Sequence, residues 1–238
     1  MKNTYVTIAL VLVGFAAAGG LIWFVGAGHS LKPQAKDTAQ QSTTQDATAV
    51  VATLHGGTDT ITRGQLDTQI QELSQNPQIH IPDPSDKEAR AKFDRLALDQ
   101  LIGSILFFNE AVKQGFVTDD KAIDAELATI TAKYQNVAAF EAARDAAKLT
   151  QETLRENVRH RLITNQYYAK IAAEHPVTVT DEEVKQFFDT QVAPQNQKAI
   201  FTDVKNDIKT HLEQQKMQEV IVGIIDELYK SADVQVLI

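Results

Sequence analysis

Residues 50–66, VVATLHGGTDTITRGQL, open the part of this chain that the sequence predicts to be folded. The first five residues are β-prone and the next five, HGGTD, are typical of a turn. Thr60 and Ile61 then predict a short returning strand. Thr62 is followed three positions later by Gln65, a capping-box pattern that marks the start of a helix. This stretch therefore predicts a hairpin that leads directly into a helix.

The remainder of the chain shows helical apolar periodicity until its last residues. Residues 233–238, DVQVLI, alternate like a strand, and a lone strand needs a partner, for which residues 50–54 are the candidate. The predicted fold class is therefore mainly α, with a small β-element that pairs the N-terminal strand with the C-terminal strand. Six further helices are predicted: from a Ser85–Glu88 cap to about 114, from Thr118, over about 137–147, from 150 to Pro176, from a Thr180–Glu183 capping box to about 189, and over about 202–230.

The N-terminus carries an apolar run without charge, residues 5–28, which begins at Tyr5 and ends at Gly28. A run longer than about 18 apolar residues can cross a bilayer, so a contact with the lipid bilayer through this segment is predicted. Two interpretations remain open: a transmembrane anchor, or a signal peptide cleaved after residue 18 or 27. The anchor is favoured because apolar residues continue beyond the first of these sites. The small residues of the segment are also spaced to pack two spans together, which leaves a homodimer open.

The predicted domain organisation follows from this run. Residues 1–4 are a short tail, residues 5–28 the anchor or signal, residues 29–48 a flexible polar linker, and residues 49–238 one helical domain. Lysines lie on both sides of the span, so the charge bias that sets membrane topology is nearly absent.

Composition excludes several classes of function. The formal net charge is −8 and the sequence shows no basic stripe, which argues against a nucleic-acid partner. The chain has no cysteine, so disulfides, thiolate catalysis and cysteine-bound zinc are excluded. The sequence contains no H-E-x-x-H, G-x-S-x-G or phosphate-loop motif, so no catalytic residue, cofactor or metal site is predicted.

Two groups of side chains are candidates for a site. Glu156 and His160 stand four positions apart on one predicted helix and could form half of a metal site. Three arginines at 155, 159 and 161 crowd the same helix, so a surface salt-bridge face is favoured instead. The chain also has two pairs of adjacent aromatic residues on predicted helices. Adjacent helical residues point about 100° apart, so one aromatic of each pair could face outward and bind an apolar peptide. The alternative is that these side chains pack in the core. These candidate substrate-binding residues are Phe107, Phe108, Tyr167 and Tyr168.

Residues 50–66 and three further stretches of this chain resemble SurA-type chaperones. The further stretches are residues 98–127, LDQLIGSILFFNEAVKQGFVTDDKAIDAEL, residues 149–171, LTQETLRENVRHRLITNQYYAKI, and residues 177–189, VTVTDEEVKQFFD. The resemblance covers residues 50–189 and, more loosely, 201–238. It implies a helical domain similar to the SurA N-terminal domain. Relatives such as PpiD and PrsA usually carry a parvulin prolyl-isomerase domain after the sixth helix, where this chain has only the short loop 190–200, so that domain is expected to be absent.

The resemblance implies a chaperone with no enzyme. We expect a single-pass protein of the inner (cytoplasmic) membrane whose domain faces the periplasm or extracytoplasmic space. It would act as a holdase that binds unfolded secreted or outer-membrane polypeptides. Two alternatives remain: an adaptor that binds one folded partner at the membrane, and a peptidyl-prolyl isomerase-family protein acting in protein folding.

Overall fold

The computed structural model describes residues 46–238 apart from residues 75, 77–78, 148 and 197. The predictions for the tail, for the anchor or signal and for most of the linker lie outside these residues. The described elements are, in order, β1 Val50–Leu54, η1 His55–Gly57, β2 Asp59–Thr62, α2 Arg63–Ser74, α3 Lys87–Lys113, α4 Asp120–Thr131, α5 Val137–Ala146, α6 Gln151–Glu174, α7 Asp181–Phe187, η2 Phe188–Val192, α8 Phe201–Ser231 and β3 Gln235–Val236.

The chain divides into two compact units. Of the described residues, 46–167 and Glu227–Ile238 form one unit, which we call the body. Residues Tyr168–Asp226 form the other, which we call the α7–α8 unit. None of the helices in the described part of the chain is long and apolar enough to cross a membrane.

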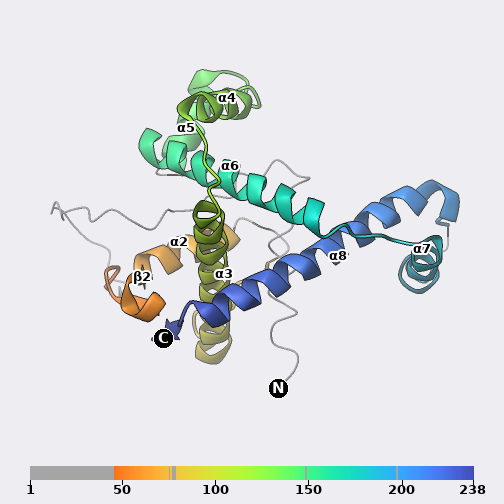
Figure 1. The fold of residues 1–238 in the computed structure, drawn as a ribbon, viewed down its shortest axis with the longest axis horizontal. Helices are drawn as coiled ribbons and strands as arrows, with labels where there is room; N and C mark the ends of the chain where they lie inside the picture. The colour runs from red at the N-terminus through yellow and green to blue at the C-terminus, as the bar shows by residue number, and fades with distance from the viewer. Residues whose placement is uncertain (1–45, 75, 77–78, 148, 197) are drawn as a thin grey trace. The chain divides into compact units, whose positions relative to one another are not determined.

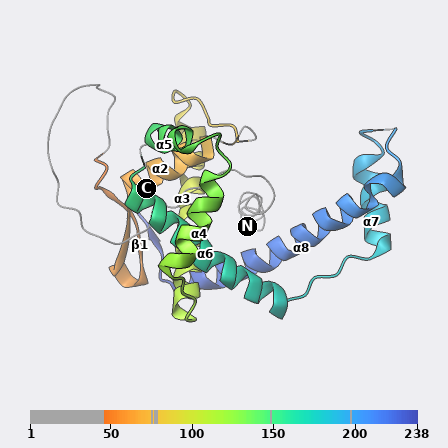
Figure 2. The same ribbon diagram turned by 90° about the horizontal axis from the view of Figure 1, so that it is seen from above.

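The three strands form one antiparallel sheet in the order β2-β1-β3. Ala52 lies opposite Ile61 of β2 on one side and opposite Val236 of β3 on the other. The Leu237 N–H donates to the Val51 carbonyl at 2.9 Å, which extends the second pairing. Figures 1 and 2 show the end of the chain beside the hairpin. The predicted pairing of the N-terminal and C-terminal strands is confirmed, and it makes β1 the central strand.

The hairpin turn uses backbone conformations that suit glycine. Gly56 and Gly57 have φ values of 67° and 93°, and His55 before them also has a positive φ, 52°. That conformation costs a non-glycine residue about 1 kcal/mol. The His55 N–H donates to the Ala232 carbonyl at 2.5 Å, and its ring lies 3.0 Å from a carboxylate oxygen of Asp59. The turn is therefore joined to the residues that lead into β3.

Two of the predicted helix starts are confirmed. The Thr62 N–H donates to Gln65 Oε1 at 2.8 Å, and the Gln65 N–H donates back to Thr62 Oγ1 at 3.4 Å. Thr180 and Glu183 form the same reciprocal capping box at 2.8 and 3.2 Å. Each box satisfies backbone donors that the first turn of a helix leaves unpaired.

The predicted start of α3 at Ser85 is wrong. Asp86 is the N-cap, and its carboxylate accepts a hydrogen bond from the Ala89 N–H at 3.0 Å. Ser85 instead donates its backbone N–H and its hydroxyl to Asp83, at 2.8 and 2.6 Å. The upstream aspartate engages the serine in a local turn, so the next residue takes the capping position.

Helix α3 is buried around most of its circumference from Ala97 to Ala111. Leu98 and Ile102 are fully buried, whereas Val112, near the end of the helix, is exposed. A helix whose apolar residues extend over more than one face must be covered by more than one neighbour. Its buried residues are Phe93, Ala97, Leu98, Gln100, Leu101, Ile102, Gly103, Ile105, Leu106, Phe107 and Ala111.

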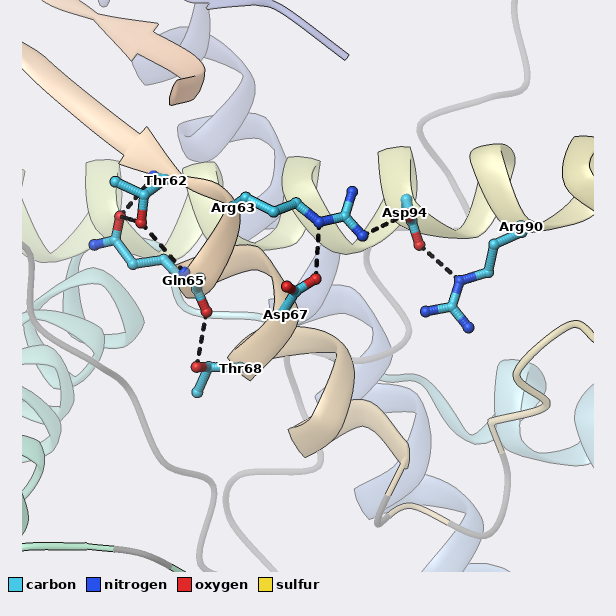
Figure 3. A network of polar contacts seen from close by, with 8 residues as sticks. Thr62, Arg63, Gln65, Asp67, Thr68, Arg90 and Asp94 are labelled. Atoms are coloured by element: carbon cyan, nitrogen blue, oxygen red, sulfur yellow. Dashed lines mark hydrogen bonds and ion pairs between the residues drawn. The ribbon is translucent and has the colours of Figure 1, made fainter. Parts of the chain in front are cut away.

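A chain of ion pairs joins α2 to the first half of α3 (Figure 3). Arg63 donates to Asp67 at 2.8 Å and to Asp94 at 3.2 Å, and Arg90 donates to the other oxygen of Asp94 at 3.0 Å. The side chains of Arg63 and Asp94 are only 16% and 13% exposed, whereas that of Asp67 is 53% exposed. The Arg63–Asp94 pair therefore connects the two helices in surroundings that exclude most water.

We expect Asp94→Asn to lower the free energy of unfolding by about 2 kcal/mol, because it leaves the half-buried Arg63 without its inter-helix partner. The control is Asp67→Asn, which removes an exposed ion pair and should cost no more than about 0.5 kcal/mol. Urea unfolding of the two variants measures the difference. Equal losses would show that the pair between the helices has no special weight.

Candidate functional site

Two of the four candidate aromatic residues lie inside the body. Phe107 of α3 and Tyr167 of α6 are both buried, and their ring centroids are 4.7 Å apart. Phe116 also packs against Tyr167, and Gln114 donates to the Tyr167 hydroxyl at 3.3 Å. These contacts place Phe107 and Tyr167 in the core that joins α3 to α6.

Phe108 and Tyr168 are less buried. Phe108 stacks on His160, with centroids 3.7 Å apart and planes 7° from parallel. Tyr168 is exposed and belongs to the α7–α8 unit. In the part of the chain that the structure describes, the four aromatic side chains therefore do not form one exposed patch. A role for them in binding polypeptide stays a prediction.

His160 lies beside Phe108 in a half-buried position rather than on an open face. Burial, and secondly the nearby charge of Arg159, lower the pKa of His160 to about 4. Its ring is therefore neutral at pH 7. Glu156 lies 3.3 Å from Arg159. Among the residues described, no group of three or more histidine or acidic side chains could hold a metal ion.

The predicted salt-bridge face of α6 is confirmed, and it joins α6 to α4. Arg155 and Arg159 approach Asp120 at 3.2 and 3.4 Å, so one carboxylate of α4 serves two arginines of α6. Arg155 also donates to Asp124, and Arg161 donates to Glu126. These charges position two helices of the body and account for this face without a ligand.

The α7–α8 unit carries a hydrophobic surface that the sequence did not single out. Its buried cluster consists of Val179, Val184, Phe188 and Ile208. Ile200, just before α8, is 60% exposed. More side chains pack against the cluster while staying partly exposed: Phe187, Val192, Ala193, Ala199, Phe201, Val204 and Leu212. We call Ile200 and these seven residues the apolar surface of the α7–α8 unit.

Ion pairs hold α7 against α8 beside this surface. Lys216 donates to Glu183 at 2.7 Å and to the carbonyl of Thr178 at 2.7 Å, and Lys205 donates to Asp181 at 2.9 Å. The acidic first turn of α7 therefore serves both as a cap and as the partner of two lysines on α8. These polar contacts join the two helices in addition to the buried cluster.

The end of α7 presents aromatic rings to the start of α8. A π-helical segment, η2, follows α7, and the Ala193 N–H donates to the Phe188 carbonyl at 2.8 Å. Phe188 meets Phe201 at a centroid distance of 5.3 Å, and the Lys185 ammonium lies within 6 Å of both rings. The sequence signals available were Phe187-Phe188 and Ile200-Phe201, but nothing local indicated that they converge.

Glu72 of α2 is a half-buried carboxylic acid in the body. Burial raises the pKa of Glu72 to about 8, against an ordinary value of 4.5. Desolvation disfavours the charged form, and no compensating charge enters this shift. The side chain therefore keeps its proton in the folded protein at neutral pH.

No family model matches the chain, and no curated protein matches it. A solved structure from Campylobacter jejuni is similar to this chain. Its description calls the virulence factor PEB4 and the periplasmic protein Cj1289 two structurally related SurA-like chaperones. The two chains are 14% identical with a TM-score of 0.48, over 79% of this chain and 99% of that chain. A likeness at this level leaves function to be argued from the residues of this chain.

We expect Glu72→Gln to change how stability depends on pH. Between about pH 4.5 and pH 8 the folded protein holds a proton on Glu72 that the unfolded chain releases, so the free energy of unfolding falls as pH rises. Glutamine has no charge to bury, so the variant should gain stability over the native protein as pH rises through this window. Urea unfolding at several pH values measures the gain. Glu141→Gln, at an exposed position, is the control, and a constant difference between Glu72→Gln and the native protein would contradict the assignment.

Proposed function

We propose that this protein is a membrane-tethered holdase that binds unfolded polypeptides. The observation that carries the proposal is the apolar surface of the α7–α8 unit, where a small buried cluster is bordered by hydrophobic side chains that stay partly exposed. A folded domain gains by burying such side chains. Apolar surface that remains uncovered is typical of a binding site for other apolar groups.

The chemistry of this surface fits a client without fixed structure. Unfolded chains expose apolar side chains in no set arrangement, so a receptor needs hydrophobic area more than directed polar groups. The ion pairs between α7 and α8 keep that area in place at no cost in hydrophobic contacts. Such binding requires neither a nucleotide nor a metal.

The resemblance to SurA-type chaperones supports a chaperone function. It also suggests where the protein is located and whether it is an enzyme. We place the protein in the inner membrane through residues 5–28, with its domain facing the periplasm or extracytoplasmic space. We also propose that it acts without prolyl-isomerase activity. The segment between η2 and α8 consists of residues 193–200, which is too short to hold a further domain.

Ile200→Asp tests the surface directly, because Ile200 is exposed and aspartate is a favourable residue before a helix. The native chain should suppress aggregation of a chemically unfolded client at equimolar ratio, and the variant should do so several-fold less well. Light scattering during dilution of the client from urea measures the effect. Val137→Asp is the matched control, since Val137 is also 60% exposed and also stands at a helix start, in the body.

The outcomes separate the three functions. Equal loss with both variants would point to general hydrophobicity and contradict the assignment to the α7–α8 unit. Absence of suppression by the native chain, with one folded partner captured at fixed stoichiometry, would favour the adaptor. Turnover of a proline peptide above the uncatalysed rate would favour the isomerase.

The tether is tested at its N-terminus. We expect the mature protein to begin at or near Met1 and to stay with the membrane after alkaline washing, because an uncleaved apolar run of this length anchors a protein. N-terminal sequencing of the membrane fraction decides this. A sequence that begins just after residue 18 or 27 would show a signal peptide and a diffusible domain.

A further inference from the structure

The sheet of the body ends in two edges of different character. In the order β2-β1-β3, the central strand β1 is paired on both sides, so any added strand must join β2 or β3. The β2 edge carries Asp59, Thr60 and Thr62, and a bulge interrupts its pairing with β1. Charged or polar residues and bulges are the usual protection of an edge. The side chains of residues 234–238, VQVLI, carry no charge, and the segment has no proline or bulge.

The backbone N–H and C=O groups of successive β3 residues point alternately toward β1 and away from it. Those that point away can hydrogen-bond to a further strand. Leu237 donates its N–H to Val51, and Gln235 lies opposite Thr53, so the odd-numbered residues of β3 turn toward β1. In an antiparallel ladder the residue between them turns the other way. The N–H and C=O of Val236 therefore point away from β1, and no hydrogen bond joins them to another described residue.

Apolar side chains surround these backbone groups. Leu237 and Ile238 are 57% and 51% exposed, and Val50, which lies at the same end of the sheet, is also exposed. Among the residues that the structure describes, the sheet thus presents unpaired backbone groups and exposed aliphatic side chains together. An uncharged apolar edge suits an uncharged strand with alternating apolar residues, because each added hydrogen bond continues the existing ladder and the side chains meet like surfaces.

We propose that the outer edge of β3 binds an extended, uncharged segment of a client polypeptide as a fourth strand. The proposal rests on the proposed function, and it adds a second mode of recognition that reads the backbone of the client rather than its side chains. It predicts that clients rich in alternating β-prone residues are preferred over helical ones.

Val236→Pro tests the edge with little change elsewhere, because proline removes one outward N–H and is tolerated on edge strands. The probe is a fluorescent eight-residue peptide of alternating Val and Thr, compared with the same peptide N-methylated at every second residue. Fluorescence anisotropy with the full chain should show binding of the unmodified peptide and weakening by roughly tenfold or more with Val236→Pro or with N-methylation. Thr60→Pro is the matched control, since Thr60 takes the corresponding outward position on β2, and it should leave binding unchanged.

Hydrogen exchange of the C-terminal residues gives a second measurement. The amide of Val236 should exchange quickly in the native protein and become protected when the peptide is added. Protection of that amide before peptide is added would show that the edge is already covered, and it would overturn the proposal. Loss of a concentration-dependent dimer in Val236→Pro would identify a second copy as the occupant and would also overturn it.

Failure of this proposal can be told from failure of the proposed function. If Val236→Pro and N-methylation leave peptide binding unchanged while Ile200→Asp still weakens suppression of aggregation, the edge proposal falls and the holdase stands. If the peptide binds at the edge but the native chain does not suppress aggregation, the holdase falls and the edge remains a peptide site.

Discussion

The body depends on the need to cover helix α3 on every side. Leu98 and Ile102 are completely buried, and between Ala97 and Ala111 no residue of this helix is fully exposed. Each covering element adds a specific contact to the hydrophobic one. Helix α2 contributes the Arg63–Asp94 pair, α6 packs Tyr167 against Phe107, and the end of α8 brings the Tyr229 hydroxyl to 3.3 Å from Asp99. Polar contacts at the margin thus set which side of α3 each element occupies.

The α7–α8 unit differs from the body, because many of its apolar side chains are only partly buried. Its buried cluster is small, and its helices are positioned by Lys205 and Lys216, which reach acidic residues in the first turn of α7. These ion pairs are partly exposed and add to the buried cluster, whereas α3 in the body leaves little apolar surface uncovered. In a protein that both folds stably and binds apolar partners, different residues can then serve stability and binding.

Local signals in the sequence predicted the elements well. The boxes at Thr62 and Thr180 depend on residues three positions apart, and both formed as predicted. The partner of the C-terminal strand was also predictable, because one short strand could not stand alone. Even the wrong cap at Ser85 is a local matter, decided by Asp83 two residues earlier.

The site was harder to predict, because exposure depends on distant contacts. Phe107-Phe108 and Tyr167-Tyr168 stood out as pairs, yet Phe107 and Tyr167 bury each other across two helices. Phe187 and Phe201 looked ordinary, and only the return of α8 toward α7 brings them against one buried cluster. Helical period shows which residues share a face, but it does not show which faces meet.

Strand β3 gives the chain a fixed order of assembly during synthesis. Its partner β1 is made before α2 through α8, whereas residues 235–236 follow the whole of α8. Contacts between such distant residues form late, because the long intervening chain must first be ordered. Until residues 235–236 have been made, one side of β1 lacks its partner strand. For the time needed to make α2 through α8, the growing chain therefore exposes a strand edge that β3 will later cover.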